Sequence, residues 1–222
     1  MIREIVLDTE TTGLDPLEGH KIIEIAAIEL IDHIQTEEKF HFYLNPEREI
    51  PEASQKIHNI SNEMVKDKPK FGEIYKNFLD FIKGDSLVIH NAEFDLAHLN
   101  HELEILGMNK IDNKVTDTLI LAREKYPGSS ISLDALCKRY RIDNSRRKKH
   151  TALIDCDLLS KVYINLIDQK EPTLNFQNID QHNLENRDLN INYFKKVVKP
   201  NDKELMEHKI YLKENLKKNF FN

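Results

Sequence analysis

The sequence predicts an α/β protein in which a mixed β-sheet carries helices on its faces. Three runs that are rich in Ile, Val and Leu or alternate in polarity open the chain, at residues 2–9, 21–31 and 38–44. Such runs are typical of strands. Later segments alternate between short apolar runs and stretches with helical spacing. Consecutive strands followed by alternating strands and helices predict a mixed sheet covered by helices.

The middle of the chain supplies a helix, a strand and a second helix. Apolar residues recur at helical spacing over residues 71–83, and Gly84 marks the expected end of that helix. Residues 86–90 form a short apolar run between turn signals, which predicts a strand. Residues 93–107 return to helical spacing, so we expect this strand to lead directly into a helix.

Helical segments dominate the next part of the chain. Residues 114–119 lead into a helical stretch that ends before Pro127. Ser132 is a predicted N-cap for a helix over residues 132–140. Residues 152–167 are strongly amphipathic, and we expect them to cover one face of the sheet.

Composition excludes several classes of protein. The 222 residues are 40% hydrophobic and 32% charged, which suffices for a packed core. No run approaches the ~20 apolar residues that a membrane span needs, and the amino-terminal segment has no apolar signal region, so we expect a cytoplasmic protein. Cys137 and Cys156 are the only cysteines, which excludes a disulfide scaffold or a cysteine-ligated zinc site.

The charge distribution argues for a local contact with phosphate. A formal net charge of −6 does not suit a protein that coats nucleic acid by bulk electrostatics. A basic cluster nevertheless occurs at residues 138–149, with seven Lys or Arg against one Asp. Such runs are usually solvated surface, but this one directly precedes His150, which favours a phosphate contact.

The composition changes near residue 168, and it divides the chain into three parts. We expect a domain at residues 1–168, a linker at 169–200 and a helix at 201–222. Between residues 175 and 192, eight of eighteen residues are Asn or Gln, a composition typical of a linker.

The terminal segment has the pattern of an isolated amphipathic helix. Asn201 and Glu204 have the spacing of a capping box, just after Pro200. A lone helix beyond a linker has no core of its own in which to bury its apolar stripe. It either docks onto a partner or folds back on the main domain.

The strongest chemical signal is a pair of carboxylates at the end of the first predicted strand. Asp8 and Glu10 are two residues apart in the segment DTETTGL, so their side chains point to the same face. Like charges this close repel unless a cation or a proton lies between them. Carboxylate oxygens suit the hard divalent cations Mg²⁺ and Mn²⁺. Two acids at this spacing are also common at a polar strand end, so further residues decide the interpretation.

Three more residues occur in matching contexts. Asp95 follows a predicted strand at the start of a helix, and His150 and Asp155 lie at the entry and inside an amphipathic helix. Taken singly, Asp95 could simply favour the helix dipole and His150 could be an ordinary surface histidine. Together with Asp8 and Glu10, they predict one site built from four acids and a histidine.

At these residues the chain resembles the DEDD exonucleases, in the branch whose last motif carries a histidine. The four acids match that family's metal ligands, and the segment HTALID at residues 150–155 matches its H-x-x-x-x-D motif. The sister branch has Tyr in a Y-x-x-x-D motif, and Thr151 stands at that place here. The histidine branch therefore fits better.

A denser resemblance links residues 4–167 to the proofreading epsilon subunits of bacterial DNA polymerase III. It rests, in order, on the segments EGHKIIEIAA, VIHNAEFD, KVTDTL, SLDALCKRYRIDNS and HTALIDCDLL. The resemblance implies an RNase H-like exonuclease fold with a five-stranded mixed sheet. It also implies 3′→5′ excision of mispaired nucleotides from the 3′ end of primer DNA, with two Mg²⁺ or Mn²⁺ ions as cofactors.

The resemblance also implies a role for each catalytic residue. Asp8 would bridge both ions, Glu10 and Asp155 would complete one metal site, and Asp95 would serve the other mainly through water. His150 would accept the proton of the attacking water, a role that an unperturbed histidine pKa suits. Its basic loop would close when a phosphate arrives.

The implied substrate contacts extend beyond the catalytic set. They are Asp8, Glu10, Thr11, Thr12, Gly13, His58, His90, Asn91, Phe94 and Asp155. Gly13 leaves room for a ligand to approach the backbone, whereas Phe94 could equally be a helix packing residue. We expect His98 and His101 on the helix surface, and Asp117 in a structural role.

Segments of the tail resemble partner-binding motifs. Residues 171–176, EPTLNF, resemble the hexapeptide by which replication proteins bind the bacterial sliding clamp, with Glu171 where the family usually has Gln. The terminal helix resembles the segment that tethers epsilon to the alpha (polymerase) subunit of DNA polymerase III, an arrangement that raises the local concentration of exonuclease at the primer end. The sequence does not decide whether a small theta-like subunit binds as well.

Two other functions compete with DNA proofreading. An RNA-trimming exonuclease of the same family, such as an oligoribonuclease, would share the site but usually lacks a counterpart of residues 168–222. An inactive scaffold would have lost at least one of the five catalytic residues, and all five are present.

Overall fold

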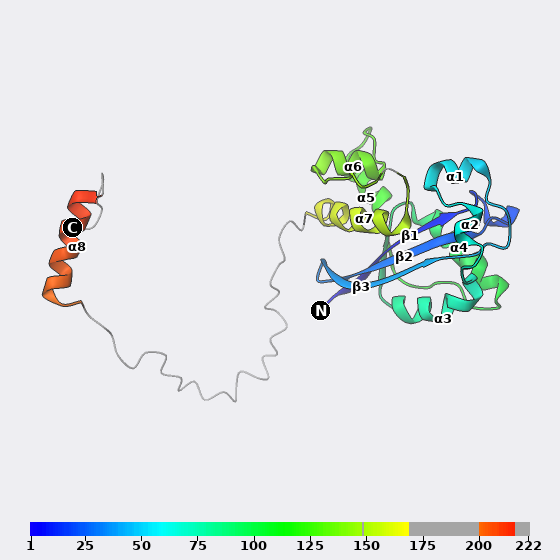
Figure 1. Ribbon diagram of the computed structural model, residues 1–222, viewed down its shortest axis with the longest axis horizontal. Coiled ribbons are helices and arrows are strands. Elements are labelled where there is room, and N and C mark those ends of the chain that lie inside the picture. The colour runs from blue at the N-terminus through cyan, green and yellow to red at the C-terminus, as the bar shows by residue number, and fades with distance from the viewer. Residues whose placement is uncertain (148, 169–199, 216–222) are drawn as a thin grey trace, which may run out of the picture. The chain divides into compact units, whose positions relative to one another are not determined.

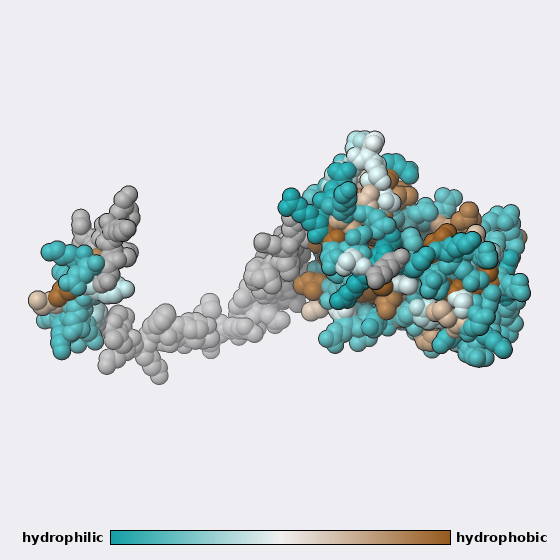
Figure 2. Space-filling model, turned by 45° about the horizontal axis from the view of Figure 1, so that its top comes forward, coloured by the Kyte–Doolittle hydropathy of each residue, from teal (hydrophilic) through white to brown (hydrophobic). Residues whose placement is uncertain are grey.

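The computed structural model describes residues 1–147, 149–168 and 200–215 (Figure 1). The chain divides into two compact units, Met1–Leu174 and Asn175–Asn222, and each is described by itself. Hydrophilic residues cover much of the face shown in Figure 2, with smaller apolar patches between them. Within the described ranges, no helix combines the length and the apolar character needed to cross a membrane.

Five strands form one mixed sheet in the order β3-β2-β1-β4-β5. The strands are β1 (Arg3–Thr11), β2 (Ile22–Ile31), β3 (Ile34–Tyr43), β4 (Ser86–Ile89) and β5 (Val115–Asp117). The pairs β1–β2 and β2–β3 are antiparallel, whereas β1, β4 and β5 run parallel. This confirms the predicted fold class. The carboxyl ends of three parallel strands lie at one edge, where open α/β sheets usually bind ligands.

Alternation along β1 divides the core into two halves. Ile5 and Leu7 belong to the buried cluster on one side of the sheet, and Val6 belongs to the cluster on the other. All three side chains are fully buried. The same alternation carries Asp8 and Glu10 to the side of Val6 and carries Thr9 to the side of Leu7.

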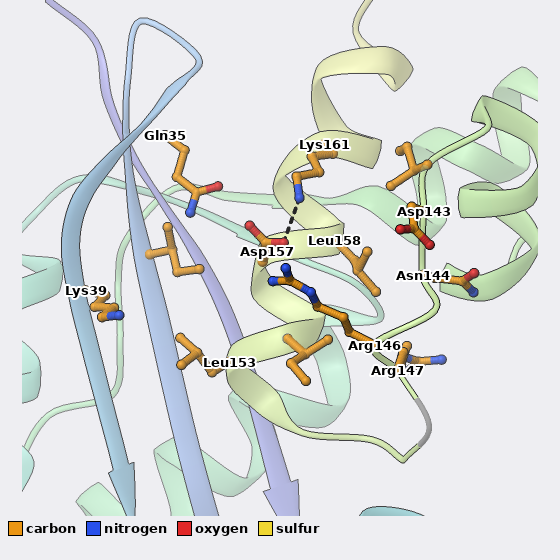
Figure 3. Close-up of a pocket in the computed structure, with 13 residues that line it drawn as sticks. Gln35, Lys39, Asp143, Asn144, Arg146, Arg147, Leu153, Asp157, Leu158 and Lys161 are labelled. Atoms are coloured by element: carbon orange, nitrogen blue, oxygen red, sulfur yellow. Dashed lines mark hydrogen bonds and ion pairs between the residues drawn. The ribbon is translucent and has the colours of Figure 1, made fainter.

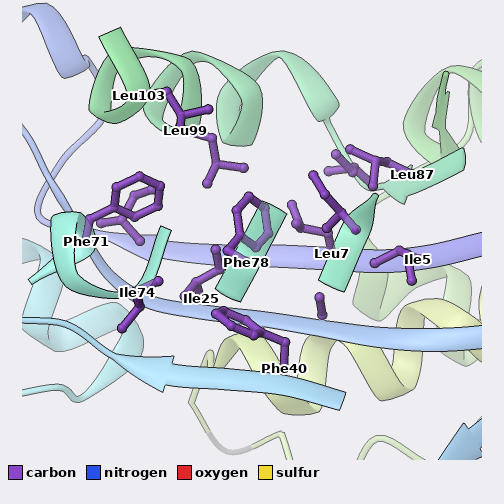
Figure 4. Packing of buried hydrophobic residues seen from close by; sticks show 14 of the residues in the cluster. Ile5, Leu7, Ile25, Phe40, Phe71, Ile74, Phe78, Leu87, Leu99 and Leu103 are labelled. Carbon is purple, nitrogen blue, oxygen red and sulfur yellow. The ribbon is translucent and has the colours of Figure 1, made fainter. Parts of the chain in front are cut away.

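One side of the sheet is covered by α3 (Phe71–Ile82) and α4 (Ala92–Ile105). Phe78 of α3 is fully buried and lies over the sheet among the residues that Figure 4 shows. Phe71 and Ile74 precede it at helical spacing and are buried as well. The predicted amphipathic pattern therefore builds this half of the core.

The opposite side is covered by three helices. They are α5 (Thr118–Lys125), α6 (Leu133–Tyr140) and α7 (Ala152–Leu166). Leu159 and Val162 of α7 join Val6 and Val88 of the sheet in one buried cluster. The predicted N-cap of α6 is confirmed, because the Ser132 hydroxyl accepts a hydrogen bond from the Ala135 N–H.

Helix α7 is attached to the sheet near both of its ends by buried glutamates. The Ala152 N–H donates to Glu24 Oε2 of β2 at 3.1 Å, and the Tyr163 hydroxyl donates to Glu4 Oε1 of β1 at 2.6 Å. Glu24 is 0% exposed and Glu4 is 6% exposed. A buried carboxylate is costly unless it is paired, so these bonds fix α7 against the sheet.

Three short helices were not predicted. They are η1 (Pro16–Glu18), α1 (Glu52–His58) and α2 (Asn62–Val65). Segments of three to seven residues are too short to show a helical period. Their sequence signals are local caps, such as Ser61, whose side chain accepts from the Met64 N–H.

Some predicted boundaries differ from the structure because of residues with positive φ. The third strand begins at Ile34 rather than residue 38, since Asp32 and His33, with φ of 49° and 65°, turn the chain back at once. The helix that starts at Phe71 ends at Ile82, and Lys83 takes the positive φ, of 46°, that was expected to need Gly84.

The carboxyl-terminal helix α8 comprises Asp202–Asn215, and the predicted residues 216–222 and the linker 169–199 lie outside the described residues. The predicted capping box is confirmed. Asn201 Oδ1 accepts from the Glu204 N–H at 2.9 Å, and Glu204 Oε2 accepts from the Asn201 N–H at 2.8 Å. Met206 and Ile210 are 68% and 46% exposed.

Phe78→Ala tests the core between α3 and the sheet. Because Phe78 is fully buried, its truncation should lower the free energy of unfolding by about 3–5 kcal/mol. Chemical denaturation measures this loss. Ile105→Ala, at a position that is 57% exposed, is the control and should cost less than about 1 kcal/mol. Equal losses for the two variants would contradict the assigned core.

Candidate active site

The predicted catalytic residues meet in one cavity of about 520 Å³ at the carboxyl ends of the parallel strands. Of the residues predicted to form the site, those that line the cavity are Asp8, Glu10, His90, Asn91, Phe94, Asp95, His150 and Asp155. The lining residues that were not predicted are Thr9, Leu14, Ser132, Leu133, Asp134, Arg147 and Leu159.

Strand β1 supplies two acids directly and fixes a third through Thr9. The Thr9 N–H and hydroxyl donate to the same oxygen of Asp95, Oδ1, at 2.9 and 2.7 Å. The pairing of β1 with β2 shifts its register between Glu10 and Thr11. Such an irregularity re-aims the side chains next to it, and sites are often built there.

The first turn of α4 carries Asp95, and Asp117 fixes the start of that helix. Asp117 Oδ1 accepts from the Asn91 N–H at 3.1 Å, and Oδ2 accepts from the Ala92 N–H at 3.0 Å. Asn91 has a φ of 71°, so the chain turns sharply between β4 and α4. The expected structural role of Asp117 is confirmed by these bonds.

The loop before α7 and the first turn of that helix complete the site. The His150 N–H donates to the carbonyl of Ile57 at 3.3 Å, which docks this loop on the end of α1. Asp155 is 3% exposed. Ligand atoms of Glu10, His150 and Asp155 all lie within 4.8 Å of one another.

Burial and mutual repulsion raise the pKa of three acids. Burial and the neighbouring Asp95 and Asp155 raise the pKa of Asp8 well above its ordinary value. Burial and Asp155 raise the pKa of Glu10 to about 8. Burial raises the pKa of Asp95 to about 7, although hydrogen bonds from Thr9 act in the opposite direction.

Asp155 differs from the other acids because it has a cationic partner. Burial alone would raise its pKa, but the hydrogen bonds from Arg147 and the positive charge of that guanidinium lower it below the ordinary value. Arg147 Nε and Nη2 donate to the two carboxylate oxygens at 2.6 and 2.8 Å. A bidentate guanidinium–carboxylate pair of this kind is a strong interaction.

The donor set fits divalent cations. Asp8 and Asp95 line the same cavity as the cluster of Glu10, His150 and Asp155. Carboxylate oxygens are the ligands that Mg²⁺ and Mn²⁺ prefer. A bound cation would also relieve the repulsion that raises the pKa of these acids.

Four residues that were predicted to contact the substrate do not line the cavity: Thr11, Thr12, Gly13 and His58. Thr12 is fully buried, and its hydroxyl oxygen lies 3.1 Å from His20 Nδ1. A Cβ at Gly13 would lie 2.3 Å from the ring of His20. A side chain at this position would therefore displace the ring of His20, a contact that the sequence interpretation did not foresee.

His58 is buried at the end of α1, with 3% of its surface exposed. Its Nδ1 accepts from the Ile60 N–H at 3.0 Å. Burial lowers the pKa of His58, so the ring is neutral and carries its proton on Nε2. Among the described residues, none forms a hydrogen bond with that nitrogen.

The expectation that His98 lies on the helix surface is wrong, because the side chain is 1% exposed. Its Nδ1 donates to the carbonyl of Phe94 at 3.1 Å, and the two ring centroids are 4.7 Å apart. Helical spacing identifies residues that share a face, but it does not say which polar residue that face buries. His101 is partly exposed.

Besides the unpredicted polar residues that line the cavity, Glu24 and the particular role of Arg147 were missed by the sequence interpretation. Glu24 lies in an apolar run that was assigned to a strand, and it is opposite Glu10 in the sheet and holds the start of α7. Arg147 lies in the basic cluster, where seven similar residues gave no reason to single it out.

A second cavity, of about 670 Å³, lies between the sheet, α7 and the loop that carries Arg147 (Figure 3). Arg146 extends into this cavity, whereas Arg147 turns away from it (Figure 3). Arg147 lines both cavities. The loop therefore forms a wall between the second cavity and the acidic site.

Comparison with known families assigns the chain to a class of enzyme. Residues 5–163 match the model of the RNase_T family, described as "Exonuclease". Because this match covers most of the chain, the chain belongs to the exonuclease family. The cavity with its four acids and histidine lies within the matched residues.

Whole-chain relatives define the family more narrowly. The chain is 47% identical over 219 residues to the DNA polymerase III subunit epsilon of Rickettsia prowazekii, an alignment that covers 95% of this chain and 96% of the relative. It is 41% identical over 228 residues to that of Pasteurella multocida, with 95% and 88% covered. The chain therefore belongs to the family of DNA polymerase III epsilon subunits.

Solved structures support the same fold. Exonuclease X, in complex with 5′ overhanging duplex DNA, is 26% identical with a TM-score of 0.61, covering 75% of this chain and 92% of that chain. The nuclease domain of 3′hExo, a DEDDh family member bound to rAMP, is 19% identical with a TM-score of 0.64, covering 76% and 92%.

The raised pKa of Glu10 predicts how stability depends on pH when a chelator removes divalent ions. The folded chain keeps a proton on Glu10 up to about pH 8, whereas the ordinary pKa is 4.5. The unfolded chain therefore binds fewer protons than the folded one over this range, so stability should fall as the pH rises from about 5 to 8. Thermal unfolding in chelator at several pH values measures this slope.

The Glu10→Gln variant should show a flatter pH dependence, because it removes the titrating group. Added Mg²⁺ should stabilise the wild type most at the upper end of the range, where the carboxylates are ionised. Glu52→Gln is the control, since the Glu52 side chain is 87% exposed, and it should leave the slope unchanged. A Glu10→Gln variant with the same slope as the wild type in chelator would refute this account.

Proposed function

We propose that this chain removes nucleotides one at a time from the 3′ end of DNA and serves as the proofreading exonuclease of DNA polymerase III. The observation that carries the proposal is the convergence of Asp8, Glu10, Asp95, Asp155 and His150 on one cavity in a chain of the exonuclease family. These residues come from β1, α4, α7 and the loop before α7. Membership in the epsilon family supports DNA as the substrate.

The acids of this chain are proposed to hold two divalent cations, Mg²⁺ or Mn²⁺. Asp8 would contribute to the binding of both ions, Glu10 and Asp155 would hold one of them, and Asp95 would hold the other. When bound, such a pair of ions activates an attacking water and stabilises the leaving 3′ oxygen. Thr9 supports this arrangement, since it holds one oxygen of Asp95 and leaves the other free of its bonds.

His150 is proposed as the general base that accepts the proton of the attacking water. It lies beside Glu10 and Asp155, and its side chain is 45% exposed, so both water and the cavity can reach it. A positioned histidine contributes about 10²–10⁴-fold to such a reaction. The His150 N–H bond to Ile57 positions the loop that carries the imidazole.

Selectivity for mispaired ends is proposed to come from the DNA rather than from a pocket that recognises mismatches. A site that takes single-stranded ends receives a frayed, mispaired terminus more often than a paired one, since unpairing costs less there. Among the residues predicted to contact the substrate, His90, Asn91 and Phe94 line the cavity.

Cleavage of a 5′-labelled primer–template with a mispaired 3′ end tests the enzymatic proposal. We expect stepwise shortening in Mg²⁺, faster on mispaired than on paired ends, and none in chelator. His150→Ala should slow the reaction by about 10²–10⁴-fold, whereas His208→Ala, on α8, should not.

The alternative functions give different results in the same assay. Cleavage of RNA oligomers without cleavage of DNA would establish the RNA-trimming alternative. If neither DNA nor RNA is cleaved, the inactive scaffold is the alternative that remains. Full activity of His150→Ala would remove this residue from the chemistry.

The segment after the exonuclease domain is proposed to bind other replication proteins. We divide the chain into a domain at 1–168, a linker at 169–200 and a helix at 201–222. In this proposal the terminal helix binds the polymerase subunit, and residues 171–176 bind the sliding clamp. Residues 171–176 lie outside the described ones. The alignment with the Rickettsia prowazekii relative supports the assignment, because it covers 95% of this chain and so extends into the tail. A small theta-like subunit is a third proposed partner.

Exposed apolar residues of α8 support a docking role. Met206 and Ile210 are one helical turn apart and 68% and 46% exposed, and apolar residues at i and i+4 are typical anchors of a helix in a groove. Figure 2 shows apolar residues on this helix beside hydrophilic ones.

Charge substitution on α8 tests this role. Met206→Glu/Ile210→Glu should weaken binding to the polymerase subunit of the same organism by at least about tenfold, since a buried unpaired carboxylate is costly. Fluorescence anisotropy of the labelled full chain measures this binding. His208→Glu adds one negative charge on the opposite side of the helix and should bind normally. Unchanged binding of the double variant would assign the contact elsewhere.

A further inference from the structure

A single guanidinium group engages three residues of the acidic site. Arg147 donates to both oxygens of Asp155 at 2.6 and 2.8 Å, to Asp134 Oδ2 at 2.6 Å, and lies 2.8 Å from His150 Nδ1. Its side chain is 7% exposed. Three of these four contacts involve Asp155 and His150, the proposed metal ligand and the proposed general base.

The position of Arg147 conflicts with a divalent cation bound to Asp155. Ligand atoms of Glu10, His150 and Asp155 lie within 4.8 Å of one another, so a cation held by them would be close to the guanidinium. Two positive groups at this separation in a buried site repel each other strongly. Asp155 can therefore bind either the guanidinium of Arg147 or a divalent cation tightly, but it cannot bind both tightly at the same time.

The same guanidinium also contacts the imidazole of His150. Arginine has five donors and no acceptor, so the 2.8 Å contact requires Nδ1 to accept. A neutral imidazole that accepts at Nδ1 carries its proton on Nε2. Neither ring nitrogen then has a free lone pair, so in this arrangement His150 cannot take a proton from water.

Asp134 and the loop hold Arg147 in this arrangement. Asp134 Oδ1 also accepts from the Asn144 side chain at 2.9 Å, which ties the loop to α6. Arg147 lines the second cavity as well as the site, so the loop that carries it borders open space on one side.

We propose that Arg147 is an internal cation that keeps Asp155 and His150 occupied together, and that binding of a divalent cation at Asp155 releases both in one event. The inference rests on the proposed function, because it takes Asp155 as a ligand and His150 as the base. It goes beyond that function by assigning a positioning residue and a coupling between metal binding and the state of the base. The chain is thereby inert before the ion binds.

Calcium binding to the full chain, without DNA, tests the competition. Isothermal titration calorimetry of the wild type, Arg147→Met and Arg146→Met separates a specific effect from a general change in charge, because Arg146 extends into the second cavity (Figure 3) and does not line the site. We expect Arg147→Met to bind Ca²⁺ more tightly, by a factor between about 5 and 150, the usual size of coupling between two sites. Arg146→Met should resemble the wild type.

A second variant keeps the test decisive if Arg147→Met does not fold. Arg147→Lys retains the charge but lacks the planar fork that engages both oxygens of Asp155, so it should bind Ca²⁺ more tightly than the wild type. Wild-type or weaker affinity in every folded Arg147 variant would overturn the proposal.

The state of His150 provides a readout that a purely structural role would not change. In long-range ¹H–¹⁵N spectra of the wild type, the side-chain nitrogens of His150, assigned by comparison with His150→Ala, should shift with the same midpoint as Ca²⁺ binding. In Arg147→Met they should already be shifted without Ca²⁺. His150 signals that are unchanged both by Ca²⁺ and by the Arg147→Met substitution would overturn the coupling.

Failure of this inference is distinguishable from failure of the proposed function. Cleavage of mispaired DNA by the wild type but not by His150→Ala would support the proposed function. If Arg147→Met then binds Ca²⁺ with the affinity of the wild type, only the inferred role of Arg147 is wrong.

Discussion

The crowding of carboxylates at the end of β1 is the constraint on which the rest of the structure depends. Asp8 and Glu10 share a face of the strand, and Asp95 and Asp155 are brought to the same cavity from two helices. Repulsion among buried acids costs stability unless each charge has a partner or a proton. The surrounding structure supplies donors to some acids, as Thr9 does, and leaves others with raised pKa values. That imbalance suits the site to binding divalent cations.

The site has a fixed part and an adjustable part. The fixed part consists of acids on β1 and on the first turns of α4 and α7, each held by buried hydrogen bonds or by the core. The adjustable part is the loop before α7, which docks on α1 through a backbone bond of His150 and carries Arg147. A reaction that must begin only when substrate and ion are both in place suits this division, because the acids can be prepared in advance.

Periodicity along the sequence predicted the sheet and the longer helices, whereas the full set of acids was predicted from their contexts and from the family resemblance. Alternation alone placed Asp8 and Glu10 on one face. Features that depend on contacts between distant segments were not predictable in this way. The role of Glu24 depends on α7, more than a hundred residues later, and that of Gly13 depends on His20. Arg147 could not be distinguished from the other basic residues of its cluster by sequence alone, because only the fold shows which of them faces Asp155.

The two glutamates that attach α7 to the sheet determine which movements the site can make. With Glu24 at one end of the helix and Glu4 near the other, α7 cannot slide along its axis without breaking a buried bond. A slip of one residue would displace Asp155 by about 1.5 Å, enough to spoil the coordination of an ion. The position of α7 along its own axis is thus fixed by these two bonds. Variation in the preceding loop can alter the rate or the substrate selectivity of the reaction while the distances among the acids stay the same.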